Sequence, residues 1–280
     1  MDLQLTGQVA VVVGGAKGLG YAIAAAFVAE GAAVVLVDRD ADMPSVARAF
    51  EATSDIQAMG CVADVTDFVA MQEIAAEVLQ RFGRCCDHVI HAAAIGSGKL
   101  GFPFWNLDPA DWDRVLRVNL IGAVNVAHAF APGMAEAHSG TLLFLASVAG
   151  QTGSQTDPPY SASKAGLINF TQCAARDLAP YGVRVNALCP GMVKTALNRS
   201  VYEAWAARQS EEEQHGHFPA PQQRPSYEEW AEEKIQRLVP LGRWQEPEDI
   251  AAMAVFLASP RAANVTGQTV NVDGGYVMHW

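Results

Sequence analysis

Short apolar runs alternate with longer, alanine-rich segments along this chain. The runs that we predict to be buried strands are Val9 to Val13, Val34 to Val37, His88 to Ala92, Leu142 to Ala146, Val183 to Leu188 and Val270 to Val272. A further strand-like segment precedes Asp64, which brings the predicted sheet to seven strands. Because strands that are apolar throughout are buried on both faces, the pattern predicts a parallel sheet covered by helices on both sides.

The segments between these runs predict helices. The expected helices are Tyr21 to Glu30, a segment that ends at Phe82, Ser161 to Leu178 and Pro247 to Leu257. Gly31 and Gly83 follow two of them, and a glycine just past the last turn is a common signal for a helix end. Strand and helix signals alternate without a linker, so we expect one doubly wound α/β domain over residues 1–280.

One stretch, Thr195 to Gln236, departs from this alternation. It is polar and contains three consecutive glutamates, three prolines and two tryptophans. These residues are Glu211, Glu212, Glu213, Pro219, Pro221, Pro225, Trp205 and Trp230. We expect an insertion at about residues 195–236 that forms two short helices. It is either a solvated surface excursion or a lid over a binding site, and we favour the lid because long insertions in compact domains are often functional.

Glycines gather where the first strand meets the first helix. The run there is Val13-Gly14-Gly15-Ala16-Lys17-Gly18-Leu19-Gly20. Without a Cβ, a glycine allows a tight turn and a close approach of the backbone to a pyrophosphate. The helix N-terminus then offers unpaired N–H groups to that anion. Glycine spacing alone is weak evidence, but its place between a strand and a helix favours a dinucleotide site.

Asp38 ends the second predicted strand. A carboxylate at that position accepts hydrogen bonds from the hydroxyls of an adenosine ribose and repels a 2′-phosphate, which favours NAD over NADP. Lys17 and Arg39 weigh the other way, because either could reach a 2′-phosphate. Asp64 and Val65 follow the third strand-like segment and either bracket the adenine or form an ordinary loop.

Tyr160 and Lys164 stand one helical turn apart at the start of a long helix, so their side chains share a face. An ammonium group beside a phenol lowers the pKa of the phenol, so we expect Tyr160 to exchange protons closer to neutral pH. Ser147 stands just past a predicted strand, at the edge of the sheet where ligands bind in open α/β folds. Its hydroxyl could hydrogen-bond a reacting oxygen.

These residues together resemble the short-chain dehydrogenase/reductase family, whose members have a single-domain Rossmann fold. The motifs that carry the resemblance are the glycine turn, Asp38, Asn119, Ser147, Tyr160-Ser161-Ala162-Ser163-Lys164, Pro190-Gly191 and Val272-Asp273-Gly274-Gly275. The resemblance implies that Tyr160 is the acid/base and that Lys164 tunes it and binds the nicotinamide ribose. It also implies that Ser147 polarises the substrate oxygen and that Asn119 holds a water linking Lys164 to solvent.

The same resemblance predicts the remaining cofactor contacts. Pro190, Gly191, Val193 and Thr195 would line the nicotinamide carboxamide. The full set of predicted cofactor-binding residues is Gly14, Lys17, Gly18, Leu19, Gly20, Asp38, Arg39, Asp64, Val65, His91, Ala92, Ala93, Tyr160, Lys164, Pro190, Gly191, Val193 and Thr195.

Two positions depart from the family's pattern. Val13 stands where the family usually has Thr, so one hydrogen bond near the glycine turn is lost. The family's Asn-Asn-Ala-Gly segment reads His91-Ala92-Ala93-Ala94 here, which removes amides that tie the central strands together. His91 could replace the first of them. These departures affect local stability and the adenosine side of the site.

Composition narrows the choice of partners. The formal net charge is −11, and an acidic surface repels nucleic acid. No run of about 18 apolar residues predicts a membrane span, and Met1 to Gln4 lacks the features of a signal peptide. The five cysteines, Cys61, Cys85, Cys86, Cys173 and Cys189, show no zinc-ligand spacing and are typical of reduced thiols in a cytoplasmic protein. His215 and His217 lack a third ligand nearby, so we expect no metal.

Charged residues make up 18% of the chain, below the usual share, which favours surface buried between subunits. The tail Tyr276 to Trp280 is also apolar and would pack on the core or on a partner. Since members of the resembled family form closed tetramers or dimers, a homotetramer is expected, with a dimer as the alternative.

The leading hypothesis is an NAD-dependent dehydrogenase acting on a secondary alcohol, with polyols and sugars as candidates. A carbonyl reductase of the 3-oxoacyl type, working in the opposite direction, uses the same residues. A non-catalytic dinucleotide sensor on the same fold is a different class, as is a methyltransferase. Neither of these would need both Tyr160 and Lys164.

Overall fold

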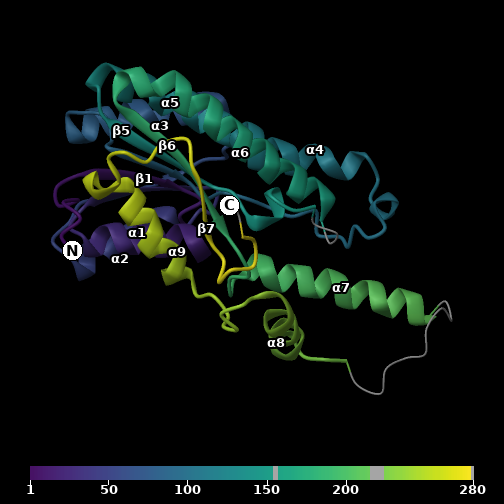
Figure 1. The fold of residues 1–280 in the computed structure, drawn as a ribbon. Coiled ribbons are helices and arrows are strands. Elements are labelled where there is room, and N and C mark those ends of the chain that lie inside the picture. Colours follow the sequence, from purple (N-terminus) through teal and green to yellow (C-terminus); the bar gives the residue numbers. More distant parts are fainter. Residues whose placement is uncertain (154–156, 215–223, 279–280) are drawn as a thin grey trace.

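A computed structural model describes the chain except residues 154–156, 215–223 and 279–280, and it describes no side chains for residues 211–214. Seven parallel strands form one sheet in the order β3-β2-β1-β4-β5-β6-β7 (Figure 1). The strands are β1 (Val9–Val13), β2 (Ala33–Asp38), β3 (Ala58–Val62), β4 (His88–His91), β5 (Gly140–Leu145), β6 (Val183–Pro190) and β7 (Thr269–Val272). The strand order reverses between β1 and β4, and open α/β sheets bind their ligands at the carboxyl edge beside such a point.

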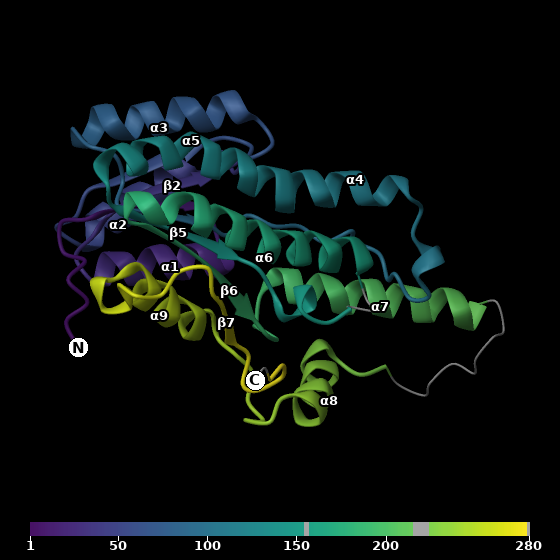
Figure 2. The same ribbon diagram turned by 45° about the horizontal axis from the view of Figure 1, so that its top comes forward.

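Helices cover both faces of this sheet, as Figure 2 shows. The α-helices are α1 (Gly18–Ala29), α2 (Met43–Thr53), α3 (Phe68–Phe82), α4 (Ala110–Leu116), α5 (Gly122–Ala137), α6 (Pro158–Leu178), α7 (Ala196–Gln214), α8 (Tyr227–Leu238) and α9 (Pro247–Ala258). A π-helical turn, η2 (Arg117–Ile121), joins α4 to α5. Short 3₁₀ turns are η1 (Phe104–Asn106), η3 (Val148–Gly150), η4 (Ala179–Tyr181) and η5 (Pro260–Ala262).

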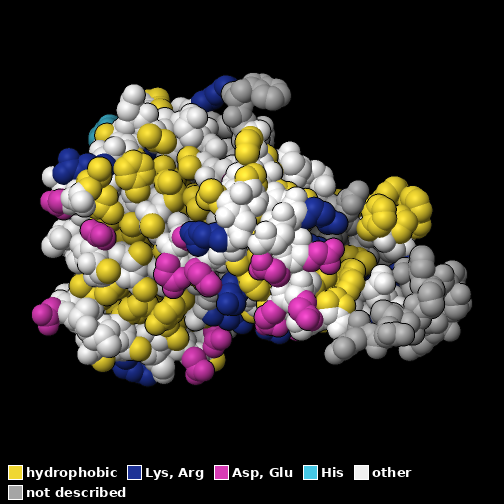
Figure 3. Space-filling model, turned by 60° about the horizontal axis from the view of Figure 1, so that its bottom comes forward, with side chains coloured by type: hydrophobic (Ala, Val, Ile, Leu, Met, Phe, Trp, Pro, Cys, Tyr) yellow, Lys and Arg dark blue, Asp and Glu magenta, His cyan; other side chains and the backbone are white. Residues whose placement is uncertain are grey.

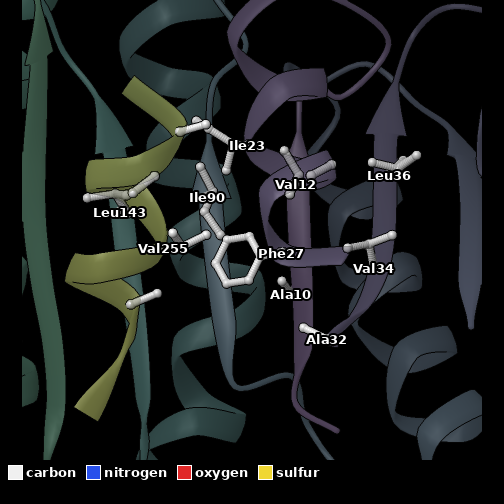
Figure 4. Packing of buried hydrophobic residues seen from close by; sticks show 14 of the residues in the cluster. Ala10, Val12, Ile23, Phe27, Ala32, Val34, Leu36, Ile90, Leu143 and Val255 are labelled. Carbon is white, nitrogen blue, oxygen red and sulfur yellow. The ribbon is translucent and has the colours of Figure 1, made fainter. Parts of the chain in front are cut away.

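The core beneath α1, α2 and α9 holds the central strands in place. Ile23 and Phe27 of α1 and Val255 of α9 point onto side chains of β1, β2, β4 and β5 (Figure 4). Phe27 is fully buried, and its ring stacks on His88 with centroids 5.5 Å apart. This packing fixes α1 over β1, so the turn between them is held from both sides.

The opposite face is covered by α3, α5 and α6, whose apolar residues form a second cluster with the alternate side chains of the same strands. The helical stretch Ala110–Ala137 is long and apolar enough to cross a membrane by length and composition alone. Its buried residues, including Val126 and Phe130, belong to this second cluster. Packing against the sheet therefore accounts for its hydropathy.

The predicted parallel seven-stranded sheet and its flanking helices are confirmed. The expectation of two short helices in the insertion is wrong for the first, because α7 runs for 19 residues. A separate aromatic cluster holds this long helix, since Tyr202 and Trp205 of α7 pack against Tyr227 and Trp230 of α8. Those apolar contacts give α7 a partner and let it extend beyond the sheet.

Several sequence predictions lie outside the described residues. They concern His215, His217, Pro219, Pro221 and Trp280, together with the side chains of Glu211, Glu212 and Glu213. Among the residues that the structure does describe, all five cysteines are unpaired. On the face shown in Figure 3, acidic and basic side chains are interspersed with apolar ones.

Phe27→Ala tests the packing that fixes α1. Removing a fully buried ring leaves a cavity between α1 and the sheet, so we expect the free energy of unfolding to fall by about 3 to 5 kcal/mol. The matched control is Phe68→Ala in α3, where the ring is 38% exposed and the loss should be about 1 kcal/mol. Urea unfolding followed by circular dichroism measures both, and equal losses would contradict the assignment.

Candidate active site

The parallel sheet brings the predicted site residues to one edge. Asp38 and His91 end β2 and β4, Pro190 ends β6, and Ser147 follows β5 by two residues. All four therefore lie at the carboxyl edge of the sheet, the edge that includes the point where the strand order reverses. Open α/β sheets bind their ligands at this place.

The glycine turn between β1 and α1 is shaped by close backbone contacts. A Cβ at Gly20 would lie 2.0 Å from the carbonyl oxygen of Gly14, and one at Gly14 would lie 2.5 Å from the amide nitrogen of Ala93. Gly18 differs, because it has a φ of +58° and no heavy atom within 4 Å of a Cβ position. Gly14 and Gly20 thus serve packing, while Gly18 leaves an open side.

The N-terminus of α1 suits an anion. Its first turn holds no acidic residue, and its N-cap, Lys17, makes no side-chain capping bond. The N–H groups of this turn are therefore left for a ligand, and the helix dipole favours a negative one. These features fit the pyrophosphate of a dinucleotide.

Asp38 lies beside this turn. One carboxylate oxygen accepts a hydrogen bond from the Ala16 amide at 3.2 Å, and the other accepts one from the Asp40 amide at 3.2 Å. The carboxylate is only partly buried, so its remaining acceptor positions can meet a ligand. Arg39 is exposed next to it. The structure therefore has both the carboxylate that favours NAD and an arginine that could reach the 2′-phosphate of NADP.

Asp64 and Val65 follow β3 at the same edge. Asp64 accepts hydrogen bonds from the amide and hydroxyl of Thr66, and the amide bond is the main cause that lowers its pKa. Val65 is buried against Gly122, and its carbonyl oxygen accepts a bond from Asn125 at 2.9 Å. This loop is consequently fixed to the start of α5.

Ser147, Tyr160 and Lys164 meet above the end of β5. The Tyr160 hydroxyl hydrogen-bonds the Ser147 side chain. The ammonium nitrogen of Lys164 lies 5.5 Å from the centre of the Tyr160 ring and donates to the carbonyl oxygen of Leu145 at 2.5 Å. Lys164 is 1% exposed. The arrangement places a phenol and a serine hydroxyl together, with a buried amine behind them.

The expectation of a lowered pKa at Tyr160 is wrong for this structure. Burial raises the pKa of Tyr160 to about 12, partly offset by the hydrogen bond from Ser147. Burial also lowers the pKa of Lys164 to about 8, since an ammonium is poorly solvated there. The cause of the discrepancy is desolvation, which acts on both groups and which helical spacing does not reveal.

Asn119 lies within the π-helical turn η2 and is fully buried. Its side-chain oxygen accepts from the Ile95 amide at 2.8 Å, and its amide group donates to the Ile95 carbonyl at 2.9 Å and to the Ser163 hydroxyl at 3.0 Å. Asn119 therefore ties the segment after β4 to α6. Ser163 was not singled out from the sequence, although it lies within the Tyr160 to Lys164 run.

His91 does not replace the family's first amide. It is fully buried beside Phe144, and neither ring nitrogen has a hydrogen-bond partner among the described residues. Burial, followed by the charge of Lys164, lowers its pKa to about 3, so the ring is neutral. Ala92 and Ala93 continue from it and pack against Gly14.

Pro190 and Gly191 are held by a residue that the sequence did not reveal. Gln245 is buried, and its side chain accepts from the Gly191 amide at 3.1 Å and donates to the Val272 carbonyl at 2.6 Å. Val193 pairs with the Gln245 backbone, and the Thr195 hydroxyl accepts from the Asn198 amide at the start of α7. A lone glutamine before a helix carries no motif, which explains why it was missed.

Asp157 is a second residue that was missed. It caps α6, three residues before Tyr160, and is 9% exposed. The signal that could have found it is an Asp followed by Pro158 at the first helical position, which is typical of a helix start. No group of three or more His, Cys, Asp or Glu residues suitable for a metal occurs in the described part of the chain.

Comparisons with known proteins agree on one family. Residues 8–205 match the sequence model described as short chain dehydrogenase, and residues 217–277 match one described as enoyl-(acyl carrier protein) reductase. The chain is 34% identical to 2-(S)-hydroxypropyl-CoM dehydrogenase 3 of Xanthobacter autotrophicus, covering 98% of each chain. It is 34% identical to acetoacetyl-CoA reductase of Synechocystis, covering 99% of each.

Among solved structures, L-sorbose reductase of Gluconobacter frateurii complexed with NADPH and L-sorbose superposes with a TM-score of 0.85 and 26% identity. The likeness covers 100% of both chains. The insertion is therefore included in the aligned length.

Lys164→Met tests the desolvated amine. With a folded pKa of about 8 against 10.5 for the free side chain, Lys164 in the unfolded chain binds more protons between these values. Burial of Lys164 therefore destabilises the fold at low pH, where the amine is charged in the unfolded chain, and this cost is relieved as pH rises from about 8 to 10.5. We expect the wild type to gain about 1 to 2 kcal/mol relative to Lys164→Met between pH 7.5 and 9.5.

Urea unfolding of both proteins at the two pH values measures this double difference. Cys189 and Tyr160, which lie near Lys164, have pKa values of about 12 in the fold and stay protonated there over this window, so their contributions largely cancel. Parallel pH dependence in the two proteins would show that Lys164 is not desolvated in the fold.

Proposed function

Because the chain belongs to the short-chain dehydrogenase family, we propose that it is an NAD-dependent oxidoreductase that interconverts a secondary alcohol and a ketone. Polyols and sugars are the candidate substrates. The observation that carries the proposal is the hydrogen bond between the hydroxyls of Tyr160 and Ser147 with the Lys164 amine behind them. A non-catalytic sensor or a methyltransferase would have no use for this set.

The proposed cofactor site follows the carboxyl edge of the sheet. The open side of Gly18 and the free N-terminus of α1 would receive the pyrophosphate. Asp38 would meet the adenosine ribose, with Asp64 and Val65 near the adenine. Pro190, Gly191, Val193 and Thr195 would lie along the nicotinamide, and the remaining predicted contacts surround the glycine turn. When bound, the nicotinamide supplies or accepts the hydride.

Tyr160 would take the proton from the substrate hydroxyl during oxidation and return it during reduction. Ser147 would donate a hydrogen bond to the same oxygen and fix its position within reach of Tyr160. Lys164 would favour the phenolate electrostatically once the phenol ionises, which counteracts the burial that raises its pKa. Asn119 would keep η2 against α6 and hold a water between Lys164 and solvent.

The choice of NAD rests on Asp38, whose charge would oppose a 2′-phosphate. The L-sorbose reductase structure contains NADPH. Similarity of fold is therefore no argument for NAD, and the proposal depends on Asp38. Running in the reducing direction, the same residues would make a 3-oxoacyl-type reductase, and the similarity to acetoacetyl-CoA reductase favours this as the second candidate. We further propose a cytoplasmic homotetramer, or a dimer, with the insertion acting as a substrate lid.

Tyr160→Phe tests the acid/base. Loss of the hydroxyl removes the proton acceptor, so we expect turnover at neutral pH to fall by a factor of about 100 or more with the fold intact. The matched control is Tyr181→Phe, which removes a hydroxyl from the turn η4 and should leave turnover unchanged. Absorbance of the reduced nicotinamide measures the rate, and near-normal turnover in Tyr160→Phe would exclude this residue from proton transfer.

Asp38→Ala tests cofactor choice. Removing the carboxylate abolishes both its ribose bonds and its repulsion of a 2′-phosphate. The ratio of kcat/KM with NADP to that with NAD should therefore rise about tenfold or more, as expected for hydrogen bonds to a charged group. Asp40→Ala removes an equal charge two residues away and should leave the ratio near the wild-type value. A similar ratio in all three proteins would rule out Asp38 as the selecting residue.

A further inference from the structure

A buried carboxylate, that of Asp157, lies close to Tyr160, the proposed acid/base. Asp157 is 9% exposed at the N-terminus of α6. One carboxylate oxygen accepts from the Tyr160 amide at 3.3 Å, and the other accepts from the Ser97 amide at 2.8 Å. Burial is the main cause that raises the pKa of Tyr160, and the negative charge of Asp157 adds to it. The carboxylate is thus near enough to influence the phenol.

Three segments that follow strands at the carboxyl edge of the sheet come together near this carboxylate. Gly96 follows β4, Asp157 follows β5, and Leu197 lies in the first turn of α7 after β6. A Cβ at Gly96 would lie 2.8 Å from the Asp157 oxygen that faces Ser97 and 3.9 Å from a methyl carbon of Leu197. Figures 1 and 2 show α7 running alongside the amino-terminal end of α6. Asp157 therefore lies near the segments that follow β4 and β6, at the edge of the sheet that carries Tyr160.

This carboxylate is not fully compensated. An ionised carboxylate offers about four lone-pair positions, the backbone bonds use one on each oxygen, and the Ser97 hydroxyl donates to a third. No lysine or arginine in the described part of the chain forms an ion pair with it. Burial raises its pKa although the amides of Ser97 and Tyr160 and the Ser97 hydroxyl lower it. A further hydrogen-bond donor at this place would be strongly favoured.

Capping of α6 does not by itself require such burial. Asp67 caps α3 in the same way, accepting from the Ala70 amide at 3.1 Å, and it is exposed. An exposed carboxylate stays hydrated, so a cap costs little there. The burial of Asp157 carries a desolvation cost that a structural cap does not explain.

We propose that Asp157 is a specificity-determining residue that accepts a hydrogen bond from a second hydroxyl group of the substrate, so that the substrates are neutral polyols or sugars. This inference rests on the proposed function and narrows it. A 3-oxoacyl group has no second hydroxyl to offer and would leave the remaining acceptor position of the carboxylate unfilled. A hydroxy acid would bring a like charge next to it. Sites built to bind a hydroxyl discriminate strongly against analogues that lack it.

Asp157→Asn is the first test. Asparagine caps helices as well as aspartate does, so α6 keeps its start, but the charge is lost. The substrates are polyols of three to six carbons and the mono-alcohols of equal chain length, assayed in both directions with NAD and NADP. We expect the wild type to prefer the polyols. In Asp157→Asn the ratio of kcat/KM for polyol to that for mono-alcohol should fall about tenfold or more, mainly through KM for the polyol. The matched control, Asp67→Asn, should leave the ratio unchanged.

Gly96→Ala is a second, independent variant. Its backbone φ lies outside the left-handed region, so alanine causes no backbone strain, but the added Cβ would lie 2.8 Å from one Asp157 oxygen and the carboxylate must shift. The capping bond from the Tyr160 amide is made by the other oxygen. We expect the same fall in the ratio of kcat/KM for polyol to that for mono-alcohol. If circular dichroism shows that Asp157→Asn does not fold, this variant alone tests the role of Asp157.

The outcomes separate the inference from the proposed function. A wild type that turns over mono-alcohols as well as polyols, or a ratio that neither variant changes, overturns the role of Asp157 and leaves the enzyme assignment standing. Equal losses on both substrate classes reduce Asp157 to a helix cap and also overturn it. Absence of any turnover with either class, either cofactor and either direction sinks the proposed function itself.

Discussion

Parallel pairing of all seven strands is the constraint on which the site depends. Since every strand runs the same way, each carboxyl end falls at one edge, and residues far apart in sequence become neighbours there. Asp38, Ser147 and Pro190 owe their proximity to this alone. The helices that return the chain cover both faces, and packing such as that of Phe27 holds the sheet and helices in register.

The chemistry at this edge is dominated by desolvation. Lys164, Tyr160 and Asp157 are each largely removed from water, and each has its neutral form favoured by burial. Groups poised in this way respond strongly to a bound ligand, because a new charge or hydrogen bond acts without competition from solvent. His91 shows the same effect, since its buried ring stays neutral behind Lys164. A substrate that enters would therefore change the balance between these groups.

Much of the fold could be predicted because its signals are local. Apolar strands, glycines past helix ends and the turn from Val13 to Gly20 all reflect the conformations that their own residues prefer. The parallel direction of the strands follows from their alternation with helices, whereas their order in the sheet comes from the structure. The grouping of Ser147 with Tyr160 came from a family pattern, because spacing along the chain cannot bring a strand end and a helix together. Gln245 escaped notice for this reason: its two partners, Gly191 and Val272, lie in different segments.

Electrostatic environment could not be predicted in the same way. The pair Tyr160 and Lys164 predicts a lowered phenol pKa only if the ammonium outweighs burial, and burial depends on every segment packed around the pair. In the fold the Lys164 ammonium donates to the Leu145 carbonyl, and burial is the main influence on Tyr160, whose pKa it raises. The same dependence makes Asp157 informative. Its type is compatible with an ordinary helix cap, and only its burial beside Gly96 supports the proposal that a substrate hydroxyl completes its hydrogen bonds.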